Sequence, residues 1–384
     1  MSTATTERTG RRPTVTALRF HKPGDIRLEQ LNLPPCGPDE ICIKVAYCGI
    51  CGTDTTEYLA GPIFPPQEGC VNPHTGVSLP VVMGHEYSGT IADIGSDIHD
   101  LQVGQSVVIS PAYNHHNRHY GSNSAQFCEP CRSGRYNICD ASATIGLNAP
   151  GGGLSERTVV RAVNCIPLPA SVSLRAAALV EPLAIGRHSL VASGFKPGQS
   201  ALIAGAGPIG LAILLLLRVM GASRVIVTEI QEPRLTQARR FGADIAINPL
   251  DYSPGENGGG VEDAVRQVAK DGGVDVAFDA IGLQSTLDLC IQCTKPGGVI
   301  FNVAIHKKAL ALNLNDLGMK EKKLMGGISY LREDFEYVIA LLAEGKLDAE
   351  QMVTSVVPLS RAVEDAFGEL IHHGGAHVKI LVQP

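Results

Sequence analysis

The sequence has no strong excess of charge, and this restricts the partners it can bind. Its 384 residues include 32 Lys and Arg against 38 Asp and Glu, which gives a net charge of −6 at pH 7. Nucleic acids and anionic membranes require a basic surface on the proteins that bind them. We therefore expect neither a nucleic-acid partner nor a membrane partner.

The first residues of the given sequence contain no apolar segment. Residues 1–12 are polar, with neither an apolar core nor a helical face, and we expect a loose tail rather than a secretory signal. Eleven cysteines in a chain without such a signal predict reduced thiols, some of them metal ligands, and a cytoplasmic location.

Charged residues make up only 18% of the chain and apolar residues 44%, which excludes an intrinsically disordered protein. The 42 glycines favour a soluble α/β protein instead. At this length a single hydrophobic core usually gives way to two, so we expect two domains. No internal repeat is evident.

One long apolar run, residues 201–217, approaches the length of a transmembrane helix. Glycines and Pro208 divide it, however, into a short strand and a helix that begins near the proline. A strand and a helix that are both buried in a parallel α/β structure have this composition. We therefore predict a buried strand–helix unit rather than a membrane span.

The remaining pattern separates two kinds of structure. Short β-branched segments and turn signals dominate residues 13–180 and predict an antiparallel, barrel-like domain with long loops. From about residue 190 strands and helices alternate, which predicts a doubly wound parallel sheet. We expect a β-rich domain over 1–188, completed by 328–384, and a doubly wound domain over 189–327.

Individual elements of the second part can be predicted as well. The predicted strands cover residues 200–205, 224–230, 244–249, 274–282 and 297–304. The predicted helices cover residues 208–221, 232–242, 261–272 and 284–295. Near the end of the chain we expect a helix over 334–346 and a last strand over 377–383 that returns to the first domain.

A glycine-rich turn joins the strand and the helix of the long apolar run. Gly205 permits a tight turn, Gly207 lets the backbone approach a pyrophosphate, and Gly210 lets the helix pack closely on the strand. Pro208 and Ile209 open the helix, whose free N–H groups and partial positive charge attract phosphates. This pattern predicts a dinucleotide site.

Glu229, at the end of the next predicted strand, indicates which dinucleotide binds. A carboxylate there accepts hydrogen bonds from the ribose hydroxyls and repels a 2′-phosphate, which favours NAD over NADP. Arg234 lies close enough in the sequence to weaken that preference, or to cover the adenosine instead. A capping role for Glu229 before the following helix is the alternative.

Four residues have the side chains of a catalytic metal site. Such a zinc site keeps three protein ligands from Cys, His and carboxylates, and leaves one position open. The candidates are Cys51 in a glycine-rich turn, the adjacent His85 and Glu86, and Glu181 in an apolar segment. Neighbouring residues on a strand point in opposite directions, so His85 and Glu86 can both bind only if the backbone bends there. Otherwise Glu86 holds a ligand in place.

These motifs together resemble the zinc-dependent medium-chain dehydrogenase/reductase superfamily along almost the whole chain. The segments that carry the resemblance are CGICGTD, MGHEYSG, EPLAIGRHSLVASGF, AGAGPIGLA, VDVAFDAIG and HVKILV. The segments GPIF, LPVVMGHE, KKALALNLNDL and YLREDFEYVI look most like the (R,R)-2,3-butanediol dehydrogenase branch, with sorbitol and threonine dehydrogenases as near relatives.

The resemblance implies a fold and an activity. It implies a GroES-like catalytic domain beside a Rossmann domain, a homodimer or homotetramer, and hydride transfer between NAD and a small alcohol or ketone. Cys51, His85 and a carboxylate of Glu86 or Glu181 would hold the catalytic zinc, and Thr53 would pass on the substrate proton. A vicinal diol or α-hydroxyketone such as 2,3-butanediol or acetoin is the expected substrate. A polyol, a specialised secondary alcohol, and a catalytically inactive NAD-binding protein are the alternatives.

The chain departs from this family in two places. The family's structural zinc uses four cysteines; Cys128, Cys131 and Cys139 match the last three, but Ala125 occupies the first position. A zinc ion still binds if His115, His116 or His119 supplies a fourth ligand; otherwise these are free thiols.

The second departure from the family lies close in the sequence to Cys51, an expected ligand of the catalytic zinc. Where relatives commonly carry a histidine five residues after the zinc cysteine, this chain has Thr56. A hydroxyl cannot store a proton near neutral pH as imidazole does. We expect weaker alcohol oxidation at neutral pH, or a different base.

Overall fold

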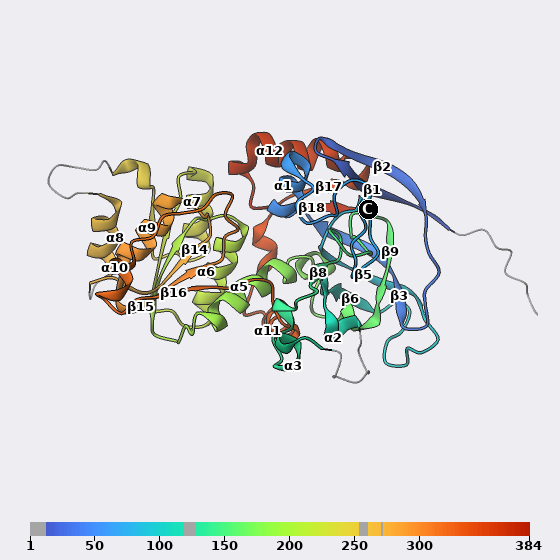
Figure 1. Ribbon diagram of the computed structural model, residues 1–384, viewed down its shortest axis with the longest axis horizontal. Helices are drawn as coiled ribbons and strands as arrows, with labels where there is room; N and C mark the ends of the chain where they lie inside the picture. Colours follow the sequence, from blue (N-terminus) through green and yellow to red (C-terminus); the bar gives the residue numbers. More distant parts are fainter. Residues whose placement is uncertain (1–12, 119–126, 253–259, 270–271) are drawn as a thin grey trace, which may run out of the picture.

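The computed structural model describes residues 13–118, 127–252, 260–269 and 272–384. Figure 1 shows a sheet flanked by helices on one side of the molecule and a β-rich body on the other, with α5 (Val180–Ala192) and α11 (Arg332–Ala343) between them. The predicted α/β class is confirmed.

The first of these bodies contains a six-stranded sheet in the order β13-β12-β11-β14-β15-β16, and all its described pairings are parallel. Its strands are β11 (Ser200–Ala204), β12 (Arg224–Thr228), β13 (Ile245–Ile247), β14 (Val274–Asp279), β15 (Thr294–Asn302) and β16 (Lys323–Gly326). Its helices are α6 (Pro208–Val219), α7 (Glu232–Arg240), α8 (Val261–Ala269), α9 (Gln284–Cys293) and α10 (Leu314–Gly318). The predicted doubly wound sheet is therefore present, with β16 as an additional edge strand.

The apolar run at 201–217 forms β11 and α6, as predicted. Residues 201–204 and 211–217 are all buried, because β11 lies at the centre of the sheet and α6 packs against α5. Within the described part of the chain, no helix is long and apolar enough to cross a membrane. Burial inside an α/β body therefore accounts for this composition.

The β-rich body is built on a seven-stranded sheet in the order β10-β6-β5-β3-β18-β17, with β9 also paired to β3. Its strands are β3 (Glu40–Gly49), β5 (Glu86–Ile94), β6 (Ser106–Ile109), β9 (Arg157–Arg161), β10 (Cys165–Pro167), β17 (Val353–Pro358) and β18 (Lys379–Gln383). A second sheet contains β1 (Thr14–Lys22), β2 (Asp25–Asn32) and β4 (Val81–Val82), and β7 (Ala112–Tyr113) pairs with β8 (Ala143–Thr144).

Short helices connect the strands of both bodies. The α-helices are α1 (Gly52–Ala60), α2 (His115–Arg118), α3 (Glu129–Arg132), α4 (Leu174–Ala177) and α12 (Glu369–His373). The 3₁₀ segments are η2 (Tyr136–Ile138), η3 (Ala162–Asn164), η4 (Pro249–Asp251), η5 (Ala349–Met352), η6 (Leu359–Arg361) and η8 (Gly374–Ala376), and η7 (Val363–Gly368) is a π-helix.

The last strand returns to the first domain, as predicted. In β18, Leu381 and Val382 pair antiparallel with Gly49 and Cys48 of β3. On its other edge β3 pairs with β5, and Gly49 lies opposite Glu86. The end of the chain therefore reaches the strand that leads into Cys51.

One helix begins earlier than predicted. The sequence pattern placed a helix over 334–346, whereas α11 begins at Arg332. The Asp334 carboxylate accepts the Leu331 N–H at 2.9 Å, which satisfies a free donor at the start of the helix. The capping side chain sets this boundary, and hydrophobic periodicity alone does not reveal it.

Candidate active site and metal centres

Cys51 is placed by the junction between β3 and α1. It occupies the N-cap position of α1, and its backbone N–H donates to Asp54 Oδ2 at 2.9 Å. Asp54 is fully buried. The carboxylate therefore anchors the turn that carries the thiol.

A bend in the chain brings His85 and Glu86 to the same place. Gly84 has φ +95°, a conformation that favours glycine, and Glu86 is the first residue of β5. The Glu86 carboxylate lies over Gly49, where any Cβ would collide with Oε2. One ligand atom from each of Cys51, His85 and Glu86 lies within 4.8 Å of the others.

The donor set fits a zinc ion: one thiol, one imidazole and one carboxylate. His85 Nδ1 lies 3.6 Å from Asp54 Oδ1, and neither atom has a hydrogen-bond partner among the described residues. Burial alone would lower the pKa of His85, but the charges of Asp54 and Cys51 outweigh it and raise the pKa well above its ordinary value. The three donor side chains are therefore already gathered, and Asp54 places a negative charge beside the imidazole.

Lys379 of β18 neutralises the carboxylate of this group. Its Nζ donates to both oxygens of Glu86 at 2.6 Å and to the Ile50 carbonyl at 3.2 Å. Lys379 and Glu86 are each 1% exposed. Burial would lower the pKa of Lys379, but the charges of Glu86 and Cys51 raise it above its ordinary value.

Glu181 lies near this group but outside it. It stands in the first turn of α5 and is 7% exposed, and it is not among the described residues whose ligand atoms all lie within 4.8 Å. Burial raises the pKa of Glu181 to about 7; the charge of His85 and a hydrogen bond with the Tyr330 hydroxyl oppose the rise. Glu181 is therefore a second buried carboxyl beside the cluster.

Two threonines of α1 have different surroundings. The Thr53 hydroxyl lies 3.6 Å from Cys51 Sγ. The Thr56 hydroxyl donates to the Gly52 carbonyl at 2.8 Å, as does that of Thr55. Thr53 therefore borders the donor group, whereas the protons of Thr55 and Thr56 are committed to the helix backbone.

The glycine-rich turn has the geometry of a phosphate-binding turn. Gly205 follows β11 with φ +103°, and Gly207 is the N-cap of α6. A Cβ at Gly210 would collide with the Gly205 carbonyl oxygen, so only glycine allows α6 to pack this closely. Pro208 and Ile209 form the first turn of α6. Its free N–H groups suit a pyrophosphate.

Glu229 follows β12 and is held by the backbone. Its Oε2 accepts the Ala206 N–H at 3.0 Å, and its Oε1 accepts the N–H groups of Ile230 and Gln231 at 2.8 and 3.0 Å. Arg234 NH1 lies 4.0 Å from Glu229 Oε2, and Arg234 NH2 donates to the Gly374 carbonyl at 2.8 Å. The carboxylate thus borders the glycine turn, and Arg234 bridges to the other domain.

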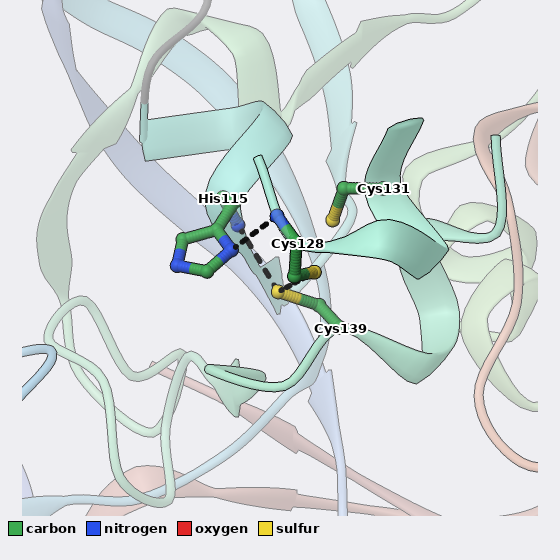
Figure 2. Close-up of side chains that lie close together, drawn as sticks. All are labelled: His115, Cys128, Cys131 and Cys139. Atoms are coloured by element: carbon green, nitrogen blue, oxygen red, sulfur yellow. Dashed lines mark hydrogen bonds between the residues drawn. The ribbon is translucent and has the colours of Figure 1, made fainter. Parts of the chain in front are cut away.

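A second cluster contains the three cysteines of the incomplete motif. Cys128, Cys131 and Cys139 lie together with His115, and one ligand atom of each lies within 4.8 Å of the others (Figure 2). His116 instead stacks on Tyr136, with ring centroids 4.2 Å apart. Ala125 and His119 lie outside the described residues. Of the two proposed histidines that the structure describes, His115 belongs to this group and His116 does not.

Sequence reasoning missed Asp54, Tyr330 and Lys379. Asp54 is contained in the CGICGTD motif, and its position three residues after Cys51 is a capping signal. No comparable signal marks Lys379 or Tyr330, because their partners Glu86 and Glu181 lie far away in the sequence.

The fold and the two clusters define a class of enzyme. Residues 37–170 match the family model of the alcohol dehydrogenase GroES-like domain, and residues 208–344 match that of the zinc-binding dehydrogenases. The chain therefore belongs to the zinc-dependent medium-chain dehydrogenases of the alcohol dehydrogenase family, which are oxidoreductases. This confirms the resemblance noted in the sequence.

Three relatives show which branch is similar. An (R,R)-butanediol dehydrogenase of Neisseria gonorrhoeae is 37% identical over 369 residues, covering 96% of this chain and 99% of the relative. The crystal structure of 2R,3R-butanediol dehydrogenase from Bacillus subtilis superposes with a TM-score of 0.86 at 34% identity, covering 96% and 99%. A sorbitol dehydrogenase of Macaca fascicularis is 30% identical, covering 92% of each chain.

Proposed function

We propose that this dehydrogenase interconverts a vicinal diol and its α-hydroxyketone, such as 2,3-butanediol and acetoin, with NAD as the hydride carrier. The observation that carries the proposal is the group of Cys51, His85 and Glu86, beside the buried carboxyl of Glu181. The similarity to butanediol dehydrogenases along nearly the whole chain supports this substrate class.

Each role in the proposed reaction can be given to a residue of this chain. Cys51, His85 and Glu86 would hold zinc, which supplies Lewis acidity toward the substrate oxygen when bound. Thr53, next to the Cys51 sulfur, would carry the hydroxyl proton away from the substrate. Glu181 would give the second oxygen of a diol a hydrogen-bond partner, because Glu86 accepts from Lys379 and would also hold the zinc.

The preference for NAD rests on Glu229. Its carboxylate lies at the glycine turn, where it would repel a 2′-phosphate. Arg234 is partly committed to the Gly374 carbonyl, which leaves it less free to bind that phosphate.

A substrate panel tests the function. We would follow NADH absorbance with each 2,3-butanediol stereoisomer, acetoin, sorbitol, threonine and simple secondary alcohols. We expect turnover of one butanediol isomer and of acetoin, abolished by a chelator and restored by zinc. Turnover of sorbitol alone would establish the polyol alternative instead. No turnover by zinc-loaded, NAD-binding protein would contradict the proposal and favour a rebuilt site around Thr56.

The last part of the proposal concerns the oligomeric state of the protein and its place in the cell. Edge strand β16 is exposed at all four residues, and large apolar side chains near it are exposed as well: Leu314, Met319, Leu324, Met325 and Ile328. An uncovered edge strand with apolar neighbours favours pairing with a second copy. We place the protein in the cytoplasm, because none of the eleven cysteines forms a disulfide. Sedimentation at several concentrations tests for the dimer, and a stable monomer would contradict it.

A further inference from the structure

The lobe formed by α2, α3 and η2 brings together four side chains whose ligand atoms all lie within 4.8 Å of one another: His115, Cys128, Cys131 and Cys139. Cys128 Sγ and Cys139 Sγ lie 3.7 Å apart. Two thiolates on one tetrahedral zinc, each at about 2.3 Å from the metal, lie about 3.8 Å apart. A disulfide requires about 2.05 Å, so the two sulfurs are placed as metal ligands are and not as a bridge.

The Nδ1 atom of His115 lies on the side of the ring that faces the cysteines (Figure 2). His115 Nδ1 accepts the Cys128 N–H at 3.4 Å, and Figure 2 shows Nε2 pointing away from the cluster. A nitrogen that accepts a hydrogen bond presents its lone pair, which is what a metal requires. The 3.4 Å contact is longer than a good N–H hydrogen bond, so a metal would displace a weak interaction.

Backbone N–H groups also point at the sulfurs. Cys139 Sγ accepts the N–H groups of His115 and Ala141, each at 3.4 Å. Such bonds stabilise thiolates, the form of cysteine that binds zinc. Cys131 and Cys139 are 2% and 4% exposed, whereas His115 and Cys128 are partly buried, so a metal here would be shielded on the side of Cys131 and Cys139.

We propose that His115, Cys128, Cys131 and Cys139 form a closed Cys₃His zinc centre, in which a histidine from α2 replaces the cysteine absent at position 125. The four protein ligands complete a tetrahedron and leave no open position, so the centre is structural and not catalytic. The proposal does not depend on which alcohol the enzyme oxidises.

The centre would stabilise the contact between the lobe and the rest of the molecule. Asn137 lies between two ligands in the sequence, and its Nδ2 contacts His188 Nε2 of α5 at 3.2 Å and the Ile328 carbonyl at 3.0 Å. His188 Nδ1 lies 2.9 Å from Asp334 Oδ2 of α11. The metal would therefore fix the lobe against both helices that lie between the domains.

Zinc content measured after gel filtration tests the assignment without any substrate. We expect about two zinc ions per chain in the wild-type protein, about one in His115→Ala, and about two again in His115→Cys, since a thiolate replaces the imidazole. His116→Ala is the matched control, because His116 neighbours His115 but stacks on Tyr136; it should retain about two.

A second measurement covers the case in which His115→Ala does not fold. Cys51→Ala removes the only thiol from the group of Cys51, His85 and Glu86. A thiolate–cobalt signal from this variant therefore comes from cobalt bound at the group with three cysteines. We expect a strong thiolate-to-cobalt charge-transfer band and the visible absorption of tetrahedral cobalt. A single zinc ion in the wild-type protein, two in His115→Ala, or no thiolate–cobalt band in Cys51→Ala would each overturn the proposal.

Discussion

Lys379 donates to both carboxylate oxygens of Glu86 at 2.6 Å, and the two side chains are among the most deeply buried charges in the described chain. The pair joins the last strand to the strand that opens at the candidate zinc site. In the absence of a metal, Lys379 provides the positive charge that Glu86 needs inside the protein.

Lys379→Met should destabilise the zinc-free protein strongly, because it leaves Glu86 buried without a counter-charge. We expect a loss of about 3–5 kcal/mol in the free energy of unfolding. Urea unfolding in the presence of a chelator measures it, and Glu86→Gln in the same chain should recover part of the loss. Lys346→Met, at an exposed pair with Glu344, is the control and should change stability little. Equal effects of the two lysine variants would contradict the role given to Lys379.

Thr53→Val should reduce kcat/KM for the diol by about 10²- to 10⁴-fold, because it removes the hydroxyl that borders the Cys51 sulfur. Thr53→Ser should retain most of the activity. The matched control is Thr55→Val, whose hydroxyl donates to the Gly52 carbonyl. If Thr53→Val and Thr55→Val gave the same kcat/KM, Thr53 would have no part in proton transfer.

Thr56→His should change the pH–rate profile. The Thr56 proton is committed to the Gly52 carbonyl, so the native residue does not store a proton, whereas imidazole titrates near pH 6.5. We expect faster oxidation near neutral pH and a new limb in the profile of kcat/KM. An unchanged profile would show that the proton leaves by another route.

Glu229→Gln should weaken NAD binding and reduce the preference for NAD over NADP. The change removes the negative charge that repels a 2′-phosphate, and weakens the bonds from the Ala206 and Ile230 N–H groups. We expect a roughly 10-fold loss in affinity for NAD, which corresponds to about 1.4 kcal/mol. Fluorescence titration with both dinucleotides measures it, and the exposed Glu232→Gln on the same turn is the control.

Asp275 should give the folded protein an acid-side pH dependence. Burial would raise its pKa, but Lys295 and the hydrogen bonds from Ser200 outweigh it and lower the pKa below its ordinary value of 3.8. The folded state therefore binds this proton less readily than the unfolded state, so the stabilisation is complete above the ordinary pKa and is lost as the pH falls through the lowered one.

Asp275→Asn should remove this part of the pH dependence. We expect the variant to lose on the order of 1 kcal/mol at pH 7 and to differ less from the wild type as the pH falls below about 4. Urea unfolding across that range measures the difference. Lys295→Met should lose part of the same stabilisation, and the two changes together should be less than additive. A constant difference at all pH values would contradict the assignment.

Much of this protein could be predicted from local patterns. The strand–helix alternation after residue 190, the glycine turn at 205–210 and the split of the apolar run all depend on neighbours in the sequence, and the structure contains each of them. The helix start at Arg332 was missed because it depends on one capping side chain, Asp334. The edge strand β16 was not predicted, because all four of its residues are exposed and it therefore lacks the alternation of buried and exposed positions that marks a half-buried strand.

The sequence by itself determined the family, the doubly wound sheet and the kinds of ligand available, because motif spacing and hydrophobic period are local properties of the chain. Only the tertiary structure decided which of those side chains meet. It brings Lys379 to Glu86, which lies 293 residues away in the sequence. It places Glu181 beside the group of Cys51, His85 and Glu86 rather than in it, and it brings His115 to the three cysteines of the second group. These contacts depend on strand register and on the return of the last strand, which no local pattern encodes.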